Sequence, residues 1–405
     1  MGSHNLMRFI FFCALTFYSF YIFANDNDLV RVRILSEQKS FAFEGEAIVF
    51  NGQREDIIPV AIPQFSKWKV QIVRKGDDRF WLASQIYPTV KKTIYRVNQN
   101  LNILGKNIGD GKNEWPGSLR LIAGKQDQFD LISVLPLKSY LVGVLNGEMP
   151  KDWPLETLKS QAVASRSYVR ALMKERKNKN FDVESDVRDQ VFTLSVSGLE
   201  SEIPVTQQQR AVKETQDLSL TFQNKIIKAY FHSDCGGEPA SVSSVWGHQG
   251  HPTSRKQCFS ERKLEWTYQI GKDELFEKMK SIWSSFDKDQ FISFKWLRLP
   301  SLQRISSVEI DFKSGKNLKI SSQEFRKLLG YTNLKSTLFQ VRQENDQYIF
   351  TGTGYGHGVG LCQYGAKAMG KLGYSYQQIL SHYYPETKLE KTKNQNKKLI
   401  RDLYL

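Results

Sequence analysis

Apolar and polar residues alternate along the N-terminal part of the chain. The alternation is clearest over residues 30–35 and 68–73, where every second residue is apolar. A period of two is typical of strands with one buried face, and turn signals such as Gly76-Asp77-Asp78 separate the runs. The pattern predicts a β-rich region over residues 25–115, followed by a hairpin over residues 118–134.

A helical period replaces this alternation after residue 150. Pro154 suits the first turn of a helix, and Asp152 precedes it as a cap. The apolar stripe that predicts the helix consists of Leu155, Leu158, Ala162, Val169 and Met173. We expect this helix to bury one face against the rest of its domain.

Strands and helices then mix through the C-terminal half. Strand patterns return at residues 218–222, 225–231 and 308–312, and helices are predicted at residues 363–372 and 375–384. The mixture predicts an α+β fold. We place one main domain at residues 116–388, with an elaboration at about 259–343 and a basic tail at 389–405.

The first residues predict the compartment. Arg8 precedes an apolar run of about fifteen residues that ends near Ala24, which is typical of a secretory signal peptide over residues 1–24. A membrane-spanning helix needs roughly 20 apolar residues. We therefore expect an exported protein of the periplasm or cell envelope, not integral to the membrane after cleavage; a buried N-terminal helix is the alternative.

The charge balance is basic. Lys and Arg total 57 against 42 Asp and Glu, a net charge of +15. Such a surface attracts polyanions, which include nucleic acid, anionic lipid and acidic cell-wall polymer. Because the basic residues are spread along the chain and a signal peptide is predicted, we expect no nucleic-acid partner.

Three cysteines remain after the predicted signal: Cys235, Cys258 and Cys362. In an oxidising compartment an odd number leaves one thiol unpaired. The interpretation that we favour is a Cys235–Cys258 disulfide. A zinc ion held by His232, Cys235 and Cys258 is the alternative, although the spacing matches no standard zinc finger.

Glu148 is the candidate acid. It follows the apolar run 140–145, and apolar surroundings disfavour the charged form of a carboxyl group, which raises its pKa toward the range of a general acid. A plain surface or capping glutamate is the alternative. Arg166 interrupts the inward stripe of the next helix and needs a polar partner there, unless it extends from the rim of the core.

A glycine-rich run lies near the C-terminus. Residues 352–360 contain five glycines, which let the backbone approach a ligand closely or adopt conformations forbidden to other residues. The run lacks the Gly-Lys-Ser/Thr ending of a phosphate loop. His357 is a candidate to hydrogen-bond a sugar and Tyr355 to stack on one, while a structural histidine is the alternative.

Several segments, taken in order, resemble the SpoIID/LytB family, named for the stage II sporulation protein D. They are Leu135-Pro136-Leu137-Lys138-Ser139-Tyr140-Leu141, Gly147-Glu148-Met149-Pro150, residues 158–168, residues 230–237, Val245-Trp246, residues 354–366 and Tyr383-Tyr384-Pro385. The resemblance covers about residues 118–387. Two departures are Lys138, where an acidic residue is usual, and the long elaboration.

The resemblance implies a peptidoglycan lytic transglycosylase, a carbon–oxygen lyase with no required cofactor. It implies that Glu148 is catalytic and that Arg166 is required. Expected partners are glycan strands, stripped of stem peptides, and a cell-wall amidase. The candidate substrate-binding residues are Gln161, Ser165, Tyr168, His232, Tyr355, His357, Gln363 and Tyr364.

Two alternatives remain open at this point. A non-catalytic peptidoglycan-binding scaffold would use the basic surface without cutting glycan. A two-carboxylate hydrolase would need a second acid, and the nearest acidic residues after the helix are Asp182, Glu184, Asp186 and Asp189.

Overall fold

The computed structural model describes most of the chain. The described residues are 28–51, 60–62, 66–87, 91–97, 100–109, 114–115, 117–193, 206–254, 256–260, 264–288, 290–299 and 303–392. The predicted signal peptide lies outside them. Helices and strands are mixed, so the α+β prediction is confirmed.

The chain forms two compact units. The first contains residues up to Lys151, then 169–217, then residues from Lys391 onward. The second contains residues 152–168 and 218–390. The chain therefore passes between the units four times, and each unit is assembled from segments that are distant in sequence.

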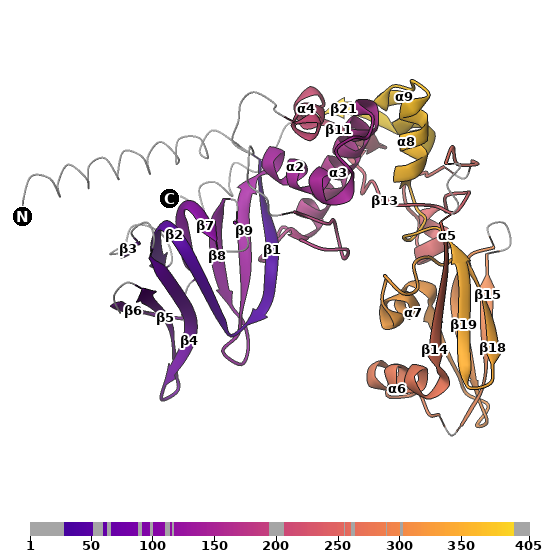
Figure 1. Ribbon diagram of the computed structural model, residues 1–405, viewed down its shortest axis with the longest axis horizontal. Helices are drawn as coiled ribbons and strands as arrows, with labels where there is room; N and C mark the ends of the chain where they lie inside the picture. The colour runs from indigo at the N-terminus through magenta and orange to yellow at the C-terminus, as the bar shows by residue number, and fades with distance from the viewer. Residues whose placement is uncertain are drawn as a thin grey trace, which may run out of the picture. The chain divides into compact units, whose positions relative to one another are not determined.

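A ten-stranded sheet forms the core of the first unit (Figure 1). Its order is β10-β1-β9-β8-β7-β2-β4-β5-β6, with β3 paired to β2. Alternate residues such as Phe43, Trp68 and Trp81 are buried, as the period of two predicts. The strands are β1 Leu29–Gln38, β2 Ser40–Asn51, β3 Val60–Ile62, β4 Lys67–Lys75, β5 Asp78–Tyr87, β6 Lys91–Arg96, β7 Leu101–Gly109, β8 Ser118–Ala123, β9 Phe129–Pro136 and β10 Val183–Glu184.

The sheet corrects the expected division of the chain at residue 116. β8 and β9 form the predicted hairpin, but they pair with β7 on one side and β1 on the other. The sheet therefore extends to Pro136, beyond the expected boundary. Its boundary could not be read from local patterns because β1 and β9 pair across almost the whole region.

Two helices of the first unit follow the sheet. α2, Leu137–Glu148, begins directly after β9, and residues 139–145 of it are buried, so the apolar run before Glu148 is a helix. α4, Gln207–Glu214, begins with a capping box between Thr206 and Gln209. α3, Leu155–Glu175, belongs to both units, because the boundary falls between Tyr168 and Val169.

The second unit contains three small sheets and one two-stranded pairing. The first sheet is β12-β11-β21 and the pairing is β13 with β20. Their strands are β11 Leu218–Phe222, β12 Lys225–Ile226, β21 Lys388–Lys391, β13 Phe231–His232 and β20 Leu361–Cys362. The helices near them are α5 Val242–Trp246, α8 Gln363–Lys371 and α9 Tyr376–Tyr383. The predicted basic tail therefore begins inside a strand.

The other two sheets share one core with α6 and α7 (Figure 1). We call it the aromatic core; its buried residues include Phe276, Phe286, Phe325 and Phe350. The elements are β14 Glu265–Gly271, β18 Phe339–Glu344, β19 Gln347–Thr353, β15 Phe291–Arg298, β16 Ile305–Phe312, β17 Asn317–Ser321, α6 Lys272–Ile282 and α7 Ser322–Leu329.

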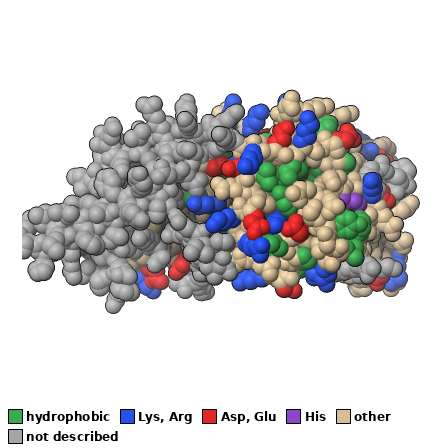
Figure 2. All heavy atoms as spheres, turned by 90° about the horizontal axis from the view of Figure 1, so that it is seen from above, with side chains coloured by type: hydrophobic (Ala, Val, Ile, Leu, Met, Phe, Trp, Pro, Cys, Tyr) green, Lys and Arg blue, Asp and Glu red, His purple; other side chains and the backbone are tan. Residues whose placement is uncertain are grey.

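The basic charge is not gathered in one field on the visible surface. Figure 2 shows Lys and Arg side chains interspersed with Asp and Glu over the described part of one face. Among the residues that the structure describes, no helix combines the length and apolar character that a membrane span requires.

Candidate functional site

Glu148 ends α2 in the first unit. Its side chain is half-buried, and its Oε1 accepts a hydrogen bond from the backbone N–H of Val191 at 2.9 Å. The neighbouring Gly147 leaves no room for a side chain, because a Cβ there would lie 2.7 Å from the Val191 carbonyl oxygen. The loop around Val191 therefore fixes the orientation of the carboxyl group.

The four acids after α3 each bind an arginine. Asp182 pairs with Arg31 at 2.7 Å, Asp189 with Arg176 at 2.5 Å and Asp186 with Arg188 at 2.8 Å. Glu184 pairs with Arg33. The Arg188 guanidinium beside Asp186 lowers the pKa of that carboxyl group below its usual value. These carboxylates are held in ion pairs of the first unit, which is a structural role.

Arg166 lies on α3 in the second unit and faces inward, as predicted. Its side chain is 3% exposed, and Nη1 donates to the carbonyl oxygen of Leu218 at 3.1 Å. Gln161 and Ser165 precede Arg166 on the same helix and are fully buried, and Gln161 Nε2 donates to Ser165 Oγ at 3.0 Å. Polar side chains of α3 thus continue into the interior of this unit.

An aromatic cluster surrounds Tyr168 of α3. Tyr168 meets Tyr230 edge to face at 5.8 Å between ring centroids, and Tyr230 lies 4.5 Å from Trp246. His357 lies 5.2 Å from Trp246, and its Nδ1 accepts the N–H of Val359 at 3.0 Å. Two predicted residues, Tyr168 and His357, thus belong to one group with Tyr230 and Trp246. Tyr230 and Trp246 were not predicted as site residues, although both lie in segments that resemble the family.

The glycine-rich run contacts its own chain. A Cβ at Gly356 would lie 2.7 Å from Cβ of His232, and one at Gly360 would lie 2.0 Å from the carbonyl oxygen of Tyr230. Both glycines have positive φ. The run therefore packs its backbone against residues 230–234, and Tyr355 pairs with Asp234 in an isolated bridge. Close approach of two backbones explains these glycines without a ligand.

The pairing of β13 with β20 positions the predicted residue His232. In this parallel pair Phe231 is opposite Leu361 and His232 is opposite Cys362. The helix α8 begins at the next residue, so Gln363 is buried in its first turn and Tyr364 follows it. Tyr364 meets Trp153 edge to face at 5.1 Å, and the Lys367 ammonium lies 4.8 Å from the centre of the Trp153 ring.

Cys235, Cys258 and Cys362 are buried, free thiols that lie near one another. The structure therefore contains no Cys235–Cys258 disulfide. One nitrogen of His232 and the sulfur atoms of Cys235 and Cys362 all lie within 4.8 Å of one another. We call His232, Cys235, Cys258 and Cys362 the thiol cluster. Cys362 was not among the predicted site residues, although it directly follows the glycine-rich run.

Burial and neighbours set the protonation of the thiol cluster. Burial lowers the pKa of His232 to about 4, so its imidazole is neutral at neutral pH. Hydrogen bonds with the thiols of Cys235 and Cys362 lower the pKa of Cys258, which makes it the thiol that loses its proton most readily. Burial raises the pKa of Cys362.

The structure distributes the predicted residues over both units. Glu148 belongs to the first unit. Arg166 and all the predicted substrate-binding residues belong to the second: Gln161, Ser165, Tyr168, His232, Tyr355, His357, Gln363 and Tyr364. Their roles in binding or catalysis remain predictions.

Known sequences match the chain in two places. The sequence model of the family described as SpoIID, stage II sporulation protein, matches residues 125–222. A model described as a domain of unknown function (DUF8618) matches residues 248–360, which span the predicted elaboration. The segment between Cys258 and Gln343 therefore recurs in other proteins.

Three relatives cover most of the matched region. An uncharacterized protein of Brachyspira hyodysenteriae is 30% identical over 90% of this chain and 94% of its own length. The stage II sporulation protein D of Bacillus amyloliquefaciens is 30% identical over 62% of this chain and 73% of its own length. The amidase enhancer of Bacillus subtilis is 27% identical over 62% of this chain and 40% of its own length. The chain belongs to the SpoIID family.

Proposed function

We propose that this protein is an exported peptidoglycan lytic transglycosylase whose acid is Glu148. The substrate is the glycosidic bond between N-acetylmuramic acid and N-acetylglucosamine, and the product carries a 1,6-anhydro ring. Relatives named for sporulation and for enhancing an amidase support a role at the cell wall. An amidase that removes stem peptides is the natural partner of such an enzyme.

Each step of the reaction uses Glu148. The neutral carboxyl group donates its proton to the bridging oxygen as the bond from that oxygen to the muramyl C1 breaks. The resulting carboxylate then takes the proton of the muramyl C6 hydroxyl, whose oxygen bonds to C1. No water is consumed, and the carboxyl group ends in its starting state.

The observation that carries the proposal is the contrast between Glu148 and the acids that follow α3. An arginine neutralises each of Asp182, Glu184, Asp186 and Asp189. The carboxyl group of Glu148 accepts a backbone N–H and is partly exposed. A hydrolase of the two-carboxylate class would use a second acid, and the acids that follow α3 are held in ion pairs. This contrast supports the internal hydroxyl as the nucleophile in place of water.

The first test replaces Glu148→Gln, which keeps the shape of the side chain and removes its acidity. Release of fragments from purified glycan strands should fall by at least about 100-fold, the usual contribution of a general acid. The matched control is Glu214→Gln in the same unit, since Glu214 is an exposed residue that pairs along α4 with Arg210. It should cleave normally. Undiminished release by the Glu148 variant would refute the assignment.

The second test identifies the products by mass. Wild-type protein should release anhydro ends from peptide-stripped sacculi, whereas reducing ends would mean hydrolysis. Asp186→Asn is the informative companion, because a hydrolase that used Asp186 would lose activity and the transglycosylase would not. Binding to sacculi without any release would favour the non-catalytic scaffold.

A further inference from the structure

One face of α2 accommodates a loop of the first unit. Tyr140, Gly143 and Gly147 recur at spacings of three and four residues, so they share one side of the helix. A Cβ at Gly143 would clash with the ring of Phe192, and one at Gly147 would lie 2.7 Å from the carbonyl oxygen of Val191. Glycine destabilises a helix relative to alanine, so the close approach of this loop explains both glycines.

The loop follows this face of α2 with residues 190–193, which we call the clamp segment. The ring of Phe192 stacks on that of Tyr140, at 5.3 Å between centroids and with planes 21° apart. The next backbone N–H, that of Thr193, donates to the carbonyl oxygen of Gly143 at 3.2 Å. Helix and clamp segment are therefore joined by ring stacking and by a backbone hydrogen bond.

A buried hydrogen bond fixes the start of the clamp segment. The Tyr140 hydroxyl donates to Oε1 of Gln190 at 2.9 Å, and the two residues are 0% and 1% exposed. A buried polar group that loses its partner is costly, so this bond favours one position of the Gln190 side chain. Asp189, the residue before it, pairs with Arg176 at 2.5 Å. The clamp segment thus begins at a point that is held from two sides.

The position of Gln190 determines the direction of the N–H that Glu148 accepts. The N–H of Val191 belongs to the planar peptide group that begins at the carbonyl carbon of Gln190. A rotation of this peptide plane would turn the N–H away from Oε1 of Glu148, which it meets at 2.9 Å. The hydroxyl of Tyr140 therefore acts on Glu148 through one side chain and one peptide plane.

We propose that Tyr140 and Gln190 are positioning residues for Glu148, and that they place its proton on Oε2. An N–H needs an acceptor, so Oε1 serves as the carbonyl oxygen of the neutral acid and Oε2 carries the hydroxyl proton. In the reaction proposed above, Oε2 is then the atom that gives the proton and later takes it back. This inference rests on the proposed function of Glu148.

The first experiment follows the Val191 amide and does not depend on activity. The full chain labelled with ¹⁵N-valine gives an NMR signal for this amide, identified by its loss in Val191→Ile. Its exchange with D₂O should be slow in the wild-type protein, because the N–H is hydrogen-bonded and exchanges only when the site opens. Tyr140→Phe and Gln190→Met each remove the buried bond and should speed this exchange by about 10-fold.

The Val134 amide is the internal control in the same unit. Val134 lies in β9, opposite Arg31 of β1 and Ser118 of β8. A general loss of stability would speed exchange at both amides, whereas a loss of positioning speeds it at Val191 alone. Unchanged exchange at Val191, or an equal change at the two amides, would overturn the proposal.

The second experiment measures cleavage of peptide-stripped glycan strands. Tyr140→Phe should lower kcat about 10-fold with little change in KM, because a displaced acid weakens the transition state more than substrate binding. The double variant with Gln190→Met should lose no more than the larger single loss, since both changes remove the same bond. Unchanged kcat in both single variants would contradict the proposal, and so would losses that add.

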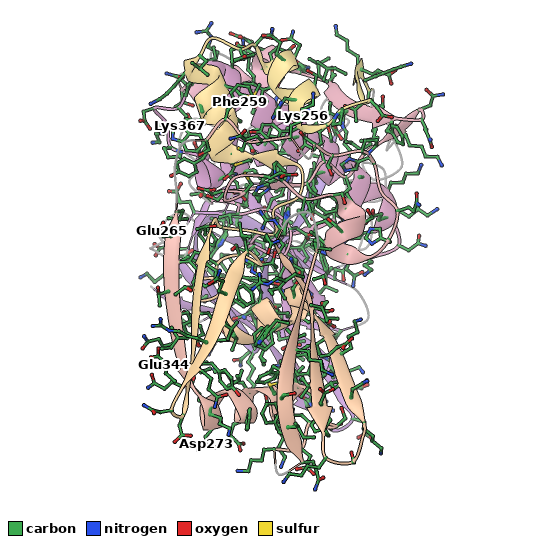
Figure 3. The ribbon with its side chains drawn as sticks, turned by 90° about the vertical axis from the view of Figure 1, so that its right-hand side faces the viewer. Lys256, Phe259, Glu265, Asp273, Glu344 and Lys367 are labelled. Atoms are coloured by element: carbon green, nitrogen blue, oxygen red, sulfur yellow. The ribbon has the colours of Figure 1, made fainter. Side chains whose placement is uncertain are left out.

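Two variants control for effects unrelated to the clamp segment. Thr215→Val removes a fully buried hydroxyl of the same unit, which donates to the carbonyl oxygen of Ala211 at 2.7 Å. Glu344→Gln removes an exposed carboxyl group of the second unit, and Figure 3 shows Glu344 at the opposite end of that unit from Lys367. Neither variant should change kcat or the exchange of the Val191 amide.

The proposed function and this inference fail in different ways. Normal cleavage by Glu148→Gln would refute the proposed function, and with it any role of the positioning in the reaction, whatever the exchange at Val191. Loss of cleavage by Glu148→Gln, with normal exchange and normal kcat in Tyr140→Phe and Gln190→Met, would refute the positioning alone. If Tyr140→Phe does not fold, Gln190→Met tests the same hydrogen bond from its other side.

Discussion

The second unit contains two buried regions with opposite character. In the aromatic core, rings pack on rings: Phe350 alone contacts Trp296, Phe325 and Phe339 at centroid distances of 5.6–6.1 Å. In the thiol cluster, ligand atoms of His232, Cys235 and Cys362 lie within 4.8 Å of one another, and the buried guanidinium of Arg304 is nearby. The first region is stabilised by removing apolar surface from water. The second has polar groups whose burial is costly unless something binds them.

The difference shows which buried residues a local sequence pattern can predict. An apolar residue has a favourable environment in any well-packed core, so period and composition predict it. A buried histidine or cysteine is explained only by its particular partners. Those partners come from segments that are distant in the sequence.

The largest expected effect tests the aromatic core. Phe350→Ala removes a fully buried ring and should lower the free energy of unfolding by about 3–5 kcal/mol, measured by urea denaturation. Phe291→Ala is the control at the half-buried edge of the same core and should cost less than half as much. An equal loss in Phe291→Ala would mean that burial of the ring does not set the loss of stability.

An intermediate effect is expected beside the thiol cluster. Tyr384 is fully buried, and its hydroxyl donates to the carbonyl oxygen of Tyr230 at 2.6 Å. Tyr384→Phe leaves that acceptor with one bond fewer and should cost about 1–2 kcal/mol in the same urea measurement. Tyr376 is only half-buried in the first turn of α9, so Tyr376→Phe should cost less. Equal losses would mean that polar satisfaction does not matter in this region.

The smallest effect concerns a helix start in the aromatic region. Ser321 caps α7 in a capping box with Glu324, and the Ser321 hydroxyl lowers the pKa of that glutamate. A lowered folded-state pKa contributes stability above the unfolded value, about 4.3, which is lost as the pH falls through the folded value. Ser321→Ala should therefore cost about 1 kcal/mol at pH 7 and less at pH 3.

The chain offers a matched control for this pH dependence. Ser375 caps α9 in a capping box with Gln378, whose side chain does not titrate. Ser375→Ala should cost a similar amount at pH 7 and at pH 3. Unfolding curves of both variants at the two values separate the charge of Glu324 from the cap itself, and a parallel acid dependence would refute its attribution to Glu324.

Sequence patterns predicted much of the fold but not its long-range pairing. The β8–β9 hairpin, the inward face of α3 and helices α8 and α9 were expected from local periods. α2 was seen only as an apolar run, because residues 139–145 are all buried and leave no helical stripe to detect. The order of the ten-stranded sheet could not be derived, since it depends on pairings between distant segments.

The candidate site divides in the same way. The inward position of Arg166 was predicted because it interrupted an apolar stripe. The position of Cys362 beside His232 was not, because the β13–β20 pair joins residues that no local pattern relates. Cys362 was left as the unpaired thiol of the three, and the structure places it opposite His232.

The place of β1 in the sheet delays its pairing during synthesis. Its neighbours are β9 and β10, and the side-chain bonds of β1 join Arg33 to Asp130 and Arg31 to Asp182, 97 and 151 residues apart. Because the chain leaves the ribosome from its N-terminus, β1 emerges before both partner strands and stays unpaired until they are made. Until then its edges are open to wrong pairing. A chaperone that binds β1 before β9 and β10 are made would protect its edges from wrong pairing.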